Sequence, residues 1–249
     1  MELPLLSFGI SFAALLVAAY GILERHQGAR RADRLRLTVI TGELAELREE
    51  LVKAETRTGD FVEIVHSRME VLAQQALSLM QAHEVSLTSA ELRVIATALE
   101  ETGFNDASEG VWGFASEAAR SEGKQQLVHA NRGHAYFLFR RFRELEARTL
   151  LEAALSQVDA SSDDERLVTL QTLTHWRVWE AEIVGPESRE VADLSERIDR
   201  VLQEFTTARS RAMAHAFLGI EPTTEESRQR DASCHQAELQ GAGVDSPGD

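Results

Sequence analysis

Arginine side chains gather in one short stretch of a sequence that is acidic as a whole. The stretch contains Arg132, Arg140, Arg141 and Arg143. A guanidinium group can hold a carboxylate through two parallel hydrogen bonds, so such a cluster could bind an acidic segment of another protein. The alternative is a solvated charged face, which is the commoner role of arginine on a helix surface. Binding requires helices that bring these side chains to one surface.

The sequence carries no recognisable catalytic or metal-binding string, neither a phosphate-binding glycine loop nor a nucleophile elbow. His83 and Glu84 lack the second histidine of a zinc-binding helix. His129 and His134 would lie about 140° apart on a helix, so they cannot share a metal. Cys234 has no base placed near it. We therefore expect no catalytic residue, no metal and no cofactor. An enzyme whose site is not recognisable in the sequence is the alternative that ranks behind two non-enzymatic functions, a membrane scaffold and an envelope protein.

The composition is that of a packed, mostly helical protein. Of 249 residues 43% are hydrophobic, only four are proline and 6% are aromatic. The formal charge of −15 disfavours nucleic acid as a partner, because binding phosphates requires a basic surface. One cysteine excludes an internal disulfide. We expect an all-α protein whose partners are other proteins.

The segment from Pro4 to Leu23 contains no charged residue. At about 1.5 Å rise per residue, a helix of that length matches a hydrocarbon layer about 30 Å thick. Basic residues follow it, and such residues remain on the cytoplasmic side of a membrane. They are Arg25, Arg30, Arg31, Arg34 and Arg36. The pattern predicts a single-pass anchor in the plasma (inner) membrane, with the amino terminus outside and the bulk of the chain in the cytoplasm.

Two alternatives to the anchor have a basis in the same residues. The triplet Val17-Ala18-Ala19 resembles a signal-peptide cleavage site, and cleavage there would export the rest of the chain as an envelope protein. The missing basic start favours the anchor over this reading. A buried helix of a soluble core is the other alternative, but such a helix would normally show a polar face.

A heptad pattern follows the arginines. Its apolar positions are Leu37, Ile40, Leu44, Leu47, Leu51 and Ala54. One interpretation is a parallel coiled coil between two anchored copies, which would make the protein a homo-oligomer; the other is a helix that folds back onto its own domain. Thr58 and Gly59 end the pattern before three heptads are complete, too soon to decide between the two. Asp60 and Glu63 predict that a helix starts again there.

Capping signals divide the rest of the chain into helices. Thr88 and Glu91 form a predicted capping box for a helix that stops near Gly103. Further helices are predicted from Asp106 to near Gly123, from about Gln125 to Phe142, from about Glu144 to Gln157, from a Ser162–Glu165 capping box to Gly185, and as one long helix from about Glu187 to Leu218.

Three tryptophans, Trp112, Trp176 and Trp179, occur on these predicted helices. They could form a recognition surface, but aromatic residues on amphipathic helices usually fill the core. We predict that all three are core residues.

Two successive helix pairs share small residues at corresponding places. The first pair has Leu92, Ile95, Ala96, Leu99, Gly103, Trp112 and Ala115, and the second has His129, Gly133, Tyr136, Leu151 and Ala154. This arrangement resembles the tetratricopeptide repeat, in which small residues let two helices approach and a large one fills the gap. Arg132 stands where that repeat has an apolar residue. The resemblance covers Thr88 to Gln157, and a third pair near Thr169 to Leu202 matches in helix length alone.

The order of anchor, basic flank and helical repeats is similar to the layout of bacterial membrane-tethered tetratricopeptide adaptors of the LapB type. That layout implies a scaffold or regulator that presents a helical platform at the membrane. In stacked repeats the first helix of each pair lines a concave groove. The candidate contacts to an acidic partner segment in that groove are Arg93, Arg132, Phe137 and Arg140.

Four regions result. Residues 1–33 are the predicted anchor with its basic flank, 34–84 a helical stem, 85–220 the tetratricopeptide-like domain, and 221–249 an acidic tail. The tail has no aromatic residue, isoleucine or methionine, so we predict that it is disordered.

Overall fold

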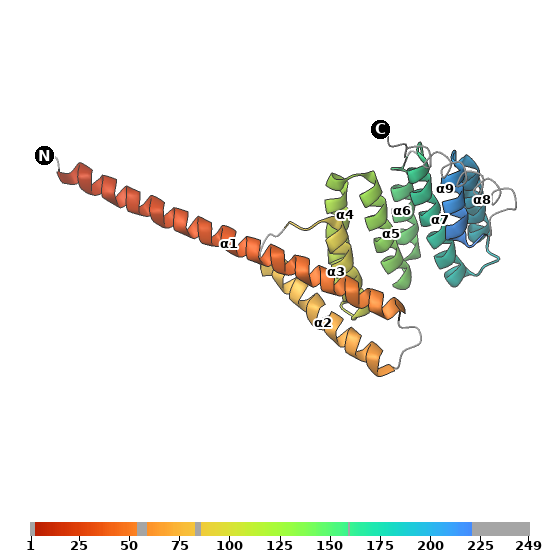
Figure 1. Ribbon diagram of the computed structural model, residues 1–249, viewed down its shortest axis with the longest axis horizontal. Coiled ribbons are helices and arrows are strands. Elements are labelled where there is room, and N and C mark those ends of the chain that lie inside the picture. The colour runs from red at the N-terminus through yellow and green to blue at the C-terminus, as the bar shows by residue number, and fades with distance from the viewer. Residues whose placement is uncertain (1–2, 54–58, 83–85, 159, 221–249) are drawn as a thin grey trace, which may run out of the picture. The chain divides into compact units, whose positions relative to one another are not determined.

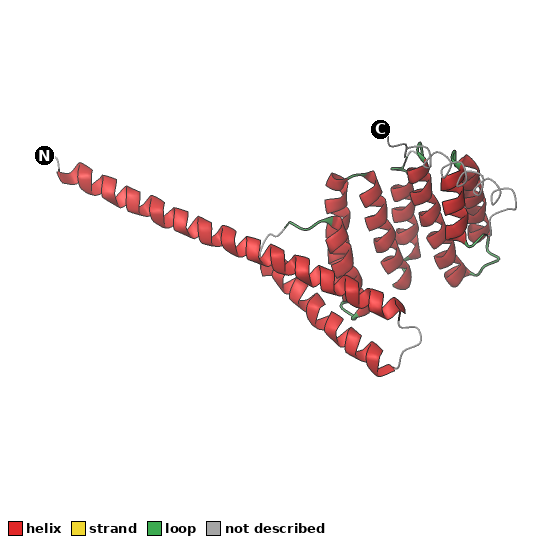
Figure 2. Cartoon of the chain, in the orientation of Figure 1, coloured by secondary structure: helices red, strands yellow, loops and turns green. Residues whose placement is uncertain are grey.

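The computed structural model describes residues 3–53, 59–82, 86–158 and 160–220, without the side chains of residues 3–23, 25 and 26. Across these residues the chain is all-α and contains no strand (Figure 2). The described helices are α1 (Leu3–Lys53), α2 (Gly59–Ala82), α3 (Ser89–Glu101), α4 (Asn105–Glu122), α5 (Lys124–Arg140), α6 (Glu144–Leu155), α7 (Asp163–Val184), α8 (Arg189–Glu204) and α9 (Ala208–Leu218). They pack mostly as consecutive antiparallel pairs, such as α1 with α2, α3 with α4 and α7 with α8.

The chain divides into two compact units, Met1–Phe137 and Leu138–Asp249. The first unit holds α1 to α4 and most of α5, and the second holds the end of α5 and α6 to α9 (Figure 1).

Four of the heptad positions of α1 are buried inside the first unit, and Leu51 is half-buried. Leu37, Ile40, Leu44 and Leu47 are at most 8% exposed, and α1 packs on both α2 and α3. Each such side chain contributes about 2 kcal/mol to folding. The heptad pattern therefore belongs to a helix folded back onto its own domain, and its apolar side chains do not form a coiled coil between two copies. Ala54, at the end of the pattern, lies outside the described residues.

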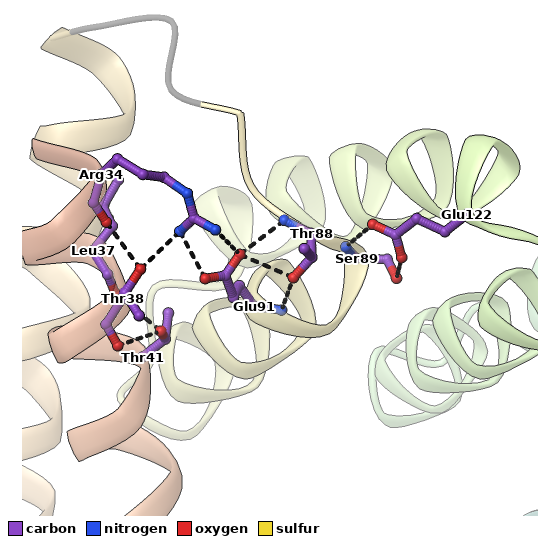
Figure 3. Close-up of polar contacts among 8 residues, drawn as sticks. All are labelled: Arg34, Leu37, Thr38, Thr41, Thr88, Ser89, Glu91 and Glu122. Carbon is purple, nitrogen blue, oxygen red and sulfur yellow. Dashed lines mark hydrogen bonds and ion pairs between the residues drawn. The ribbon is translucent and has the colours of Figure 1, made fainter. Parts of the chain in front are cut away.

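The start of α3 is fixed by one carboxylate with two roles. Thr88 Oγ1 accepts a hydrogen bond from Glu91 N (3.3 Å), and the Glu91 carboxylate accepts one from Thr88 N (2.9 Å), which confirms the predicted capping box. The same carboxylate accepts two bonds from the Arg34 guanidinium, at 2.7 and 2.9 Å (Figure 3). Burial alone would raise the pKa of Glu91, but the bonds from Arg34 and Thr88 hold it below its usual value. The pair therefore ties α1 to the first turn of α3.

Small polar residues join α3 to α4. Ser108 Oγ donates to the carbonyl of Ala96 (2.8 Å) in a buried contact, and Ser89 N donates to the Glu122 carboxylate at the end of α4 (2.8 Å; Figure 3). Helix α4 begins at Asn105, one residue before the predicted start at Asp106, which lies in its first turn.

The predicted single helix from Glu187 to Leu218 is wrong, because the chain breaks between α8 and α9. Phe205 has an extended backbone (φ −62°, ψ 127°) and is only 2% exposed. The Asp163 carboxylate, at the start of α7, accepts hydrogen bonds from Thr206 N and Thr207 N, both at 3.0 Å. Thr207 then caps α9. The carboxylate satisfies amides that a continuous helix would have used itself.

Other predicted boundaries hold with small shifts. Gly185, at φ 96°, ends α7 as predicted. Ser162 caps α7, but the Glu165 carboxylate accepts from Ser161 N (3.0 Å) rather than closing a box with Ser162. The three tryptophans are at most 8% exposed, which confirms them as core residues.

Within the described part of the chain, no helix combines the length and the hydropathy that crossing a bilayer requires. The side chains from Pro4 to Leu23 are outside the described residues, as are His83, Glu84 and the tail at 221–249. The anchor and the disordered tail stay predictions.

Candidate anion-binding site

Arg93 on α3 and Arg132 on α5 both belong to the first unit. Both side chains are partly buried. Burial lowers the pKa of Arg132, and the positive charge of Arg93 lowers it further. His129, three residues before Arg132 on the same helix face, places its Nδ1 3.1 Å from Arg132 Nη2. We call Arg93, His129 and Arg132 the basic cluster.

His129 is the neutral member of the basic cluster. The Arg132 guanidinium can only donate, so His129 Nδ1 is assigned as the acceptor and the ring proton to Nε2. Burial, followed by the charges of Arg132 and Arg93, lowers the pKa of His129 to about 4. At neutral pH the cluster therefore holds two positive charges and an uncharged imidazole.

Donors of the basic cluster are left without acceptors. Arg93 Nε and Arg132 Nη1 are buried and have no hydrogen-bond partner, and neither guanidinium makes an ion pair with a described residue. The charge of Glu122 raises the pKa of Arg93 and partly offsets its burial, but the Glu122 carboxylate is bonded to Ser89. Leaving a buried donor unsatisfied costs about 1–3 kcal/mol, a cost that a carboxylate reaching these two nitrogens would remove.

Helix α5 is held in register by a close approach to α4. A Cβ on Gly133 would lie 2.3 Å from Cη2 of Trp112, so only glycine fits at this position. Next to it, Ser116 Oγ donates to Asn131 Oδ1 (2.9 Å). Residues 131 and 133 thus fix the rotation of α5 about its axis, and with it the direction in which Arg132 leaves the helix.

The other two predicted contacts do not join the basic cluster. Phe137 is 1% exposed and lies in the core, with its ring 6.4 Å from that of His134. It follows Gly133 by one helical turn, so it shares the inward face of α5. Arg140, the last residue of α5, is exposed and belongs to the second unit.

Sequence reasoning considered His129 as a metal ligand and as part of the repeat pattern, and missed it as a member of the site. Its spacing of three from Arg132 was the available signal, because residues at that spacing share a helix face. Among the described residues, no group of histidine, cysteine, aspartate and glutamate side chains is placed to hold a metal ion.

Comparisons of the chain with protein-family models, with curated proteins and with solved structures give no significant match, so no family is identified.

Proposed function

We propose that this chain is a protein-binding module that captures an acidic segment of its partner at Arg93 and Arg132. The observation that carries the proposal is the pair of partly buried guanidiniums, each with a buried donor left unsatisfied and neither with a carboxylate partner among the described residues. Two like charges held together in this way are costly unless a ligand compensates them. A carboxylate does so with short, charge-assisted hydrogen bonds.

The helix arrangement supports a tetratricopeptide-like platform for this capture. Ala96 accepts the buried Ser108 hydroxyl of α4, and Gly133 admits the Trp112 ring, so small residues at both repeat positions allow close helix contact. Helices α3 and α5 are the first helices of successive pairs, the ones that line the concave groove in such arrays. Arg93 and Arg132 lie on these two helices.

The module would act at the cytoplasmic face of the membrane, held by the anchor at Pro4–Leu23. Tethering raises its effective concentration near membrane partners, which suits a scaffold or regulator without catalytic chemistry. Mass spectrometry of the mature amino terminus separates this arrangement from the exported alternative. An intact start is expected, whereas cleavage after Ala19 would place the protein in the envelope.

Photo-crosslinking tests the capture directly. A photoreactive phenylalanine at Tyr136, one turn from Arg132 and exposed, should give crosslinked partner bands in native membranes. The bands should disappear in Arg93→Glu/Arg132→Glu and persist in the matched control Arg141→Glu, an exposed arginine in the second unit. Circular dichroism checks that helicity is unchanged. Bands that survive the double charge reversal in a folded protein would refute the proposal.

A further inference from the structure

The α1–α2 hairpin has an open apolar groove beside its buried seam, and Ile40 lies at the border between the two. Figure 1 shows α2 running back along the second half of α1. The groove is lined by Leu35, Arg36, Val39, Ile40, Glu43, Leu72, Gln75, Ser78 and Leu79, and continues along Asp60, Glu63, Ile64, Ser67, Arg68 and Val71. Several of these apolar side chains are more than half exposed: Leu35 69%, Val39 59%, Ile64 62% and Val71 53%. Apolar side chains in such a continuous strip mark a surface that another molecule covers.

Two opposite charges face each other across this groove without pairing. Glu43 on α1 and Arg68 on α2 line the same part of it. Neither side chain forms a hydrogen bond or an ion pair with a described residue. Because they lie at the same level of the hairpin, on different helices, they are complementary to a second copy of the same face.

We propose that a second copy of this chain covers the groove, packed in parallel about a two-fold axis that runs along the hairpin. This axis lays α1 of one copy over α2 of the other at the same level, so Glu43 meets Arg68 of the second copy, and the contact occurs twice. Leu35 and Val39 then face Leu79 and Leu72 of the second copy, and the two hairpins form a four-helix bundle.

The charges select this arrangement over its competitors. An antiparallel pairing centred on the same level would bring Glu43 against Glu43 of the second copy, which is repulsive. An anionic lipid surface is disfavoured because Asp60 and Glu63 lie on the groove beside Glu43. The heptad seam cannot serve as the contact, since Leu37, Leu44 and Leu47 are buried within the chain. The proposal depends neither on the basic cluster nor on the anchor.

Charge reversal and its repair provide the experiment. The full-length chain in mild detergent should be a dimer by native mass spectrometry at micromolar concentration. Glu43→Arg should raise the dimer dissociation constant about tenfold or more, because it sets two arginines together at both symmetric contacts. Glu43→Arg/Arg68→Glu should restore the dimer. The control Glu196→Arg, the same charge reversal at an exposed position of α8 in the second unit, should leave it unchanged.

Several results would overturn the proposal. They are a monomeric wild type, a dimer indifferent to Glu43→Arg, and a double variant that stays monomeric although circular dichroism shows it folded. A monomer that sediments with lipid vesicles, and loses this on Leu35→Glu/Val39→Glu, would identify lipid as the occupant and would also overturn it.

Discussion

Arg148 on α6 and Glu180 on α7 form a two-point ion pair in the core of the second unit. The Nε–Oε1 and Nη2–Oε2 distances are 2.6 and 2.7 Å, and the Glu180 side chain is 1% exposed. Trp176 Nε1 donates to the same carboxylate at 2.8 Å. Burial by itself would raise the pKa of Glu180, but Arg148 and Trp176 hold it below its usual value. The carboxylate stays charged in the core because both partners are present.

Removing the arginine should therefore destabilise the fold. We expect Arg148→Met to lower the free energy of unfolding by about 2–3 kcal/mol in urea titrations; the loss is below that for a fully buried pair because the Arg148 side chain is 33% exposed. Adding Glu180→Gln should recover much of this loss, since the amide is uncharged and still accepts from Trp176. Arg189→Met, in an exposed pair with Asp193, serves as the control and should change stability by less than about 0.5 kcal/mol. If Arg148→Met and Arg189→Met lowered the free energy of unfolding equally, the ion pair between Arg148 and Glu180 would not stabilise the core as assigned.

Gly133→Ala should destabilise the first unit through a steric clash. The new methyl group would lie 2.3 Å from Trp112 Cη2, so the buried indole ring or the two helices must shift, at a cost of about 1–3 kcal/mol. Gly113→Ala on α4 is the matched control: nothing lies within 4 Å of its Cβ, and better helix propensity should raise stability by up to about 1 kcal/mol. Trp112→Phe in the Gly133→Ala background should restore part of the loss, measured by thermal unfolding. If Gly133→Ala left the thermal stability unchanged, the close packing of Gly133 against Trp112 would not be required for the fold.

Features decided by local chemistry were predictable from the sequence. The Thr88–Glu91 capping box and the stop at Gly185 depend on residues within one turn, and both are present. The break at Phe205 was not predictable, because Asp163, far away in the chain, supplies the carboxylate that stabilises it.

The candidate site divides in the same way. The helix-pair pattern placed Arg93 and Arg132 on the first helices of two predicted pairs, and in the structure the charge of Arg93 lowers the pKa of Arg132. Phe137 was misjudged because amphipathic periodicity does not say which face of α5 turns inward. The close packing of Gly133 against Trp112 settles that question, and only the structure gives it.

Asp163 should control whether α9 stays docked on α7. Its pKa is lowered well below the usual value, first by the hydrogen bond from Thr206 N, then by those from Thr207 N and Arg166. A depressed carboxyl pKa contributes stability that is present above the unfolded value near 3.8 and is lost as pH falls below it. Asp163→Ala should therefore speed hydrogen exchange at the amides of Thr206 and Thr207. Asp164→Ala, at the exposed neighbouring position, should not change the exchange rate of these amides. Unchanged exchange in Asp163→Ala would show that the Asp163 carboxylate does not hold them.

The basic cluster should reveal itself in the titration of His129. Its pKa of about 4 lies below the unfolded value of 6.5, so the unfolded chain binds more protons between these values. Stability is therefore complete above pH 6.5 and falls as pH drops toward 4. Allowing for solvent screening of a partly exposed ring, the loss should be about 1–2 kcal/mol. His129→Gln should remove this part of the pH dependence.

Nuclear magnetic resonance can follow the same group one atom at a time. The ring proton signal of His129 should titrate near pH 4 in the wild type and move toward 6.5 in Arg93→Met/Arg132→Met, because both positive charges that oppose protonation are gone. If His129 titrates near 6.5 in the wild type, the two guanidiniums do not act on it, and the charge pair that carries the proposed function is absent in solution.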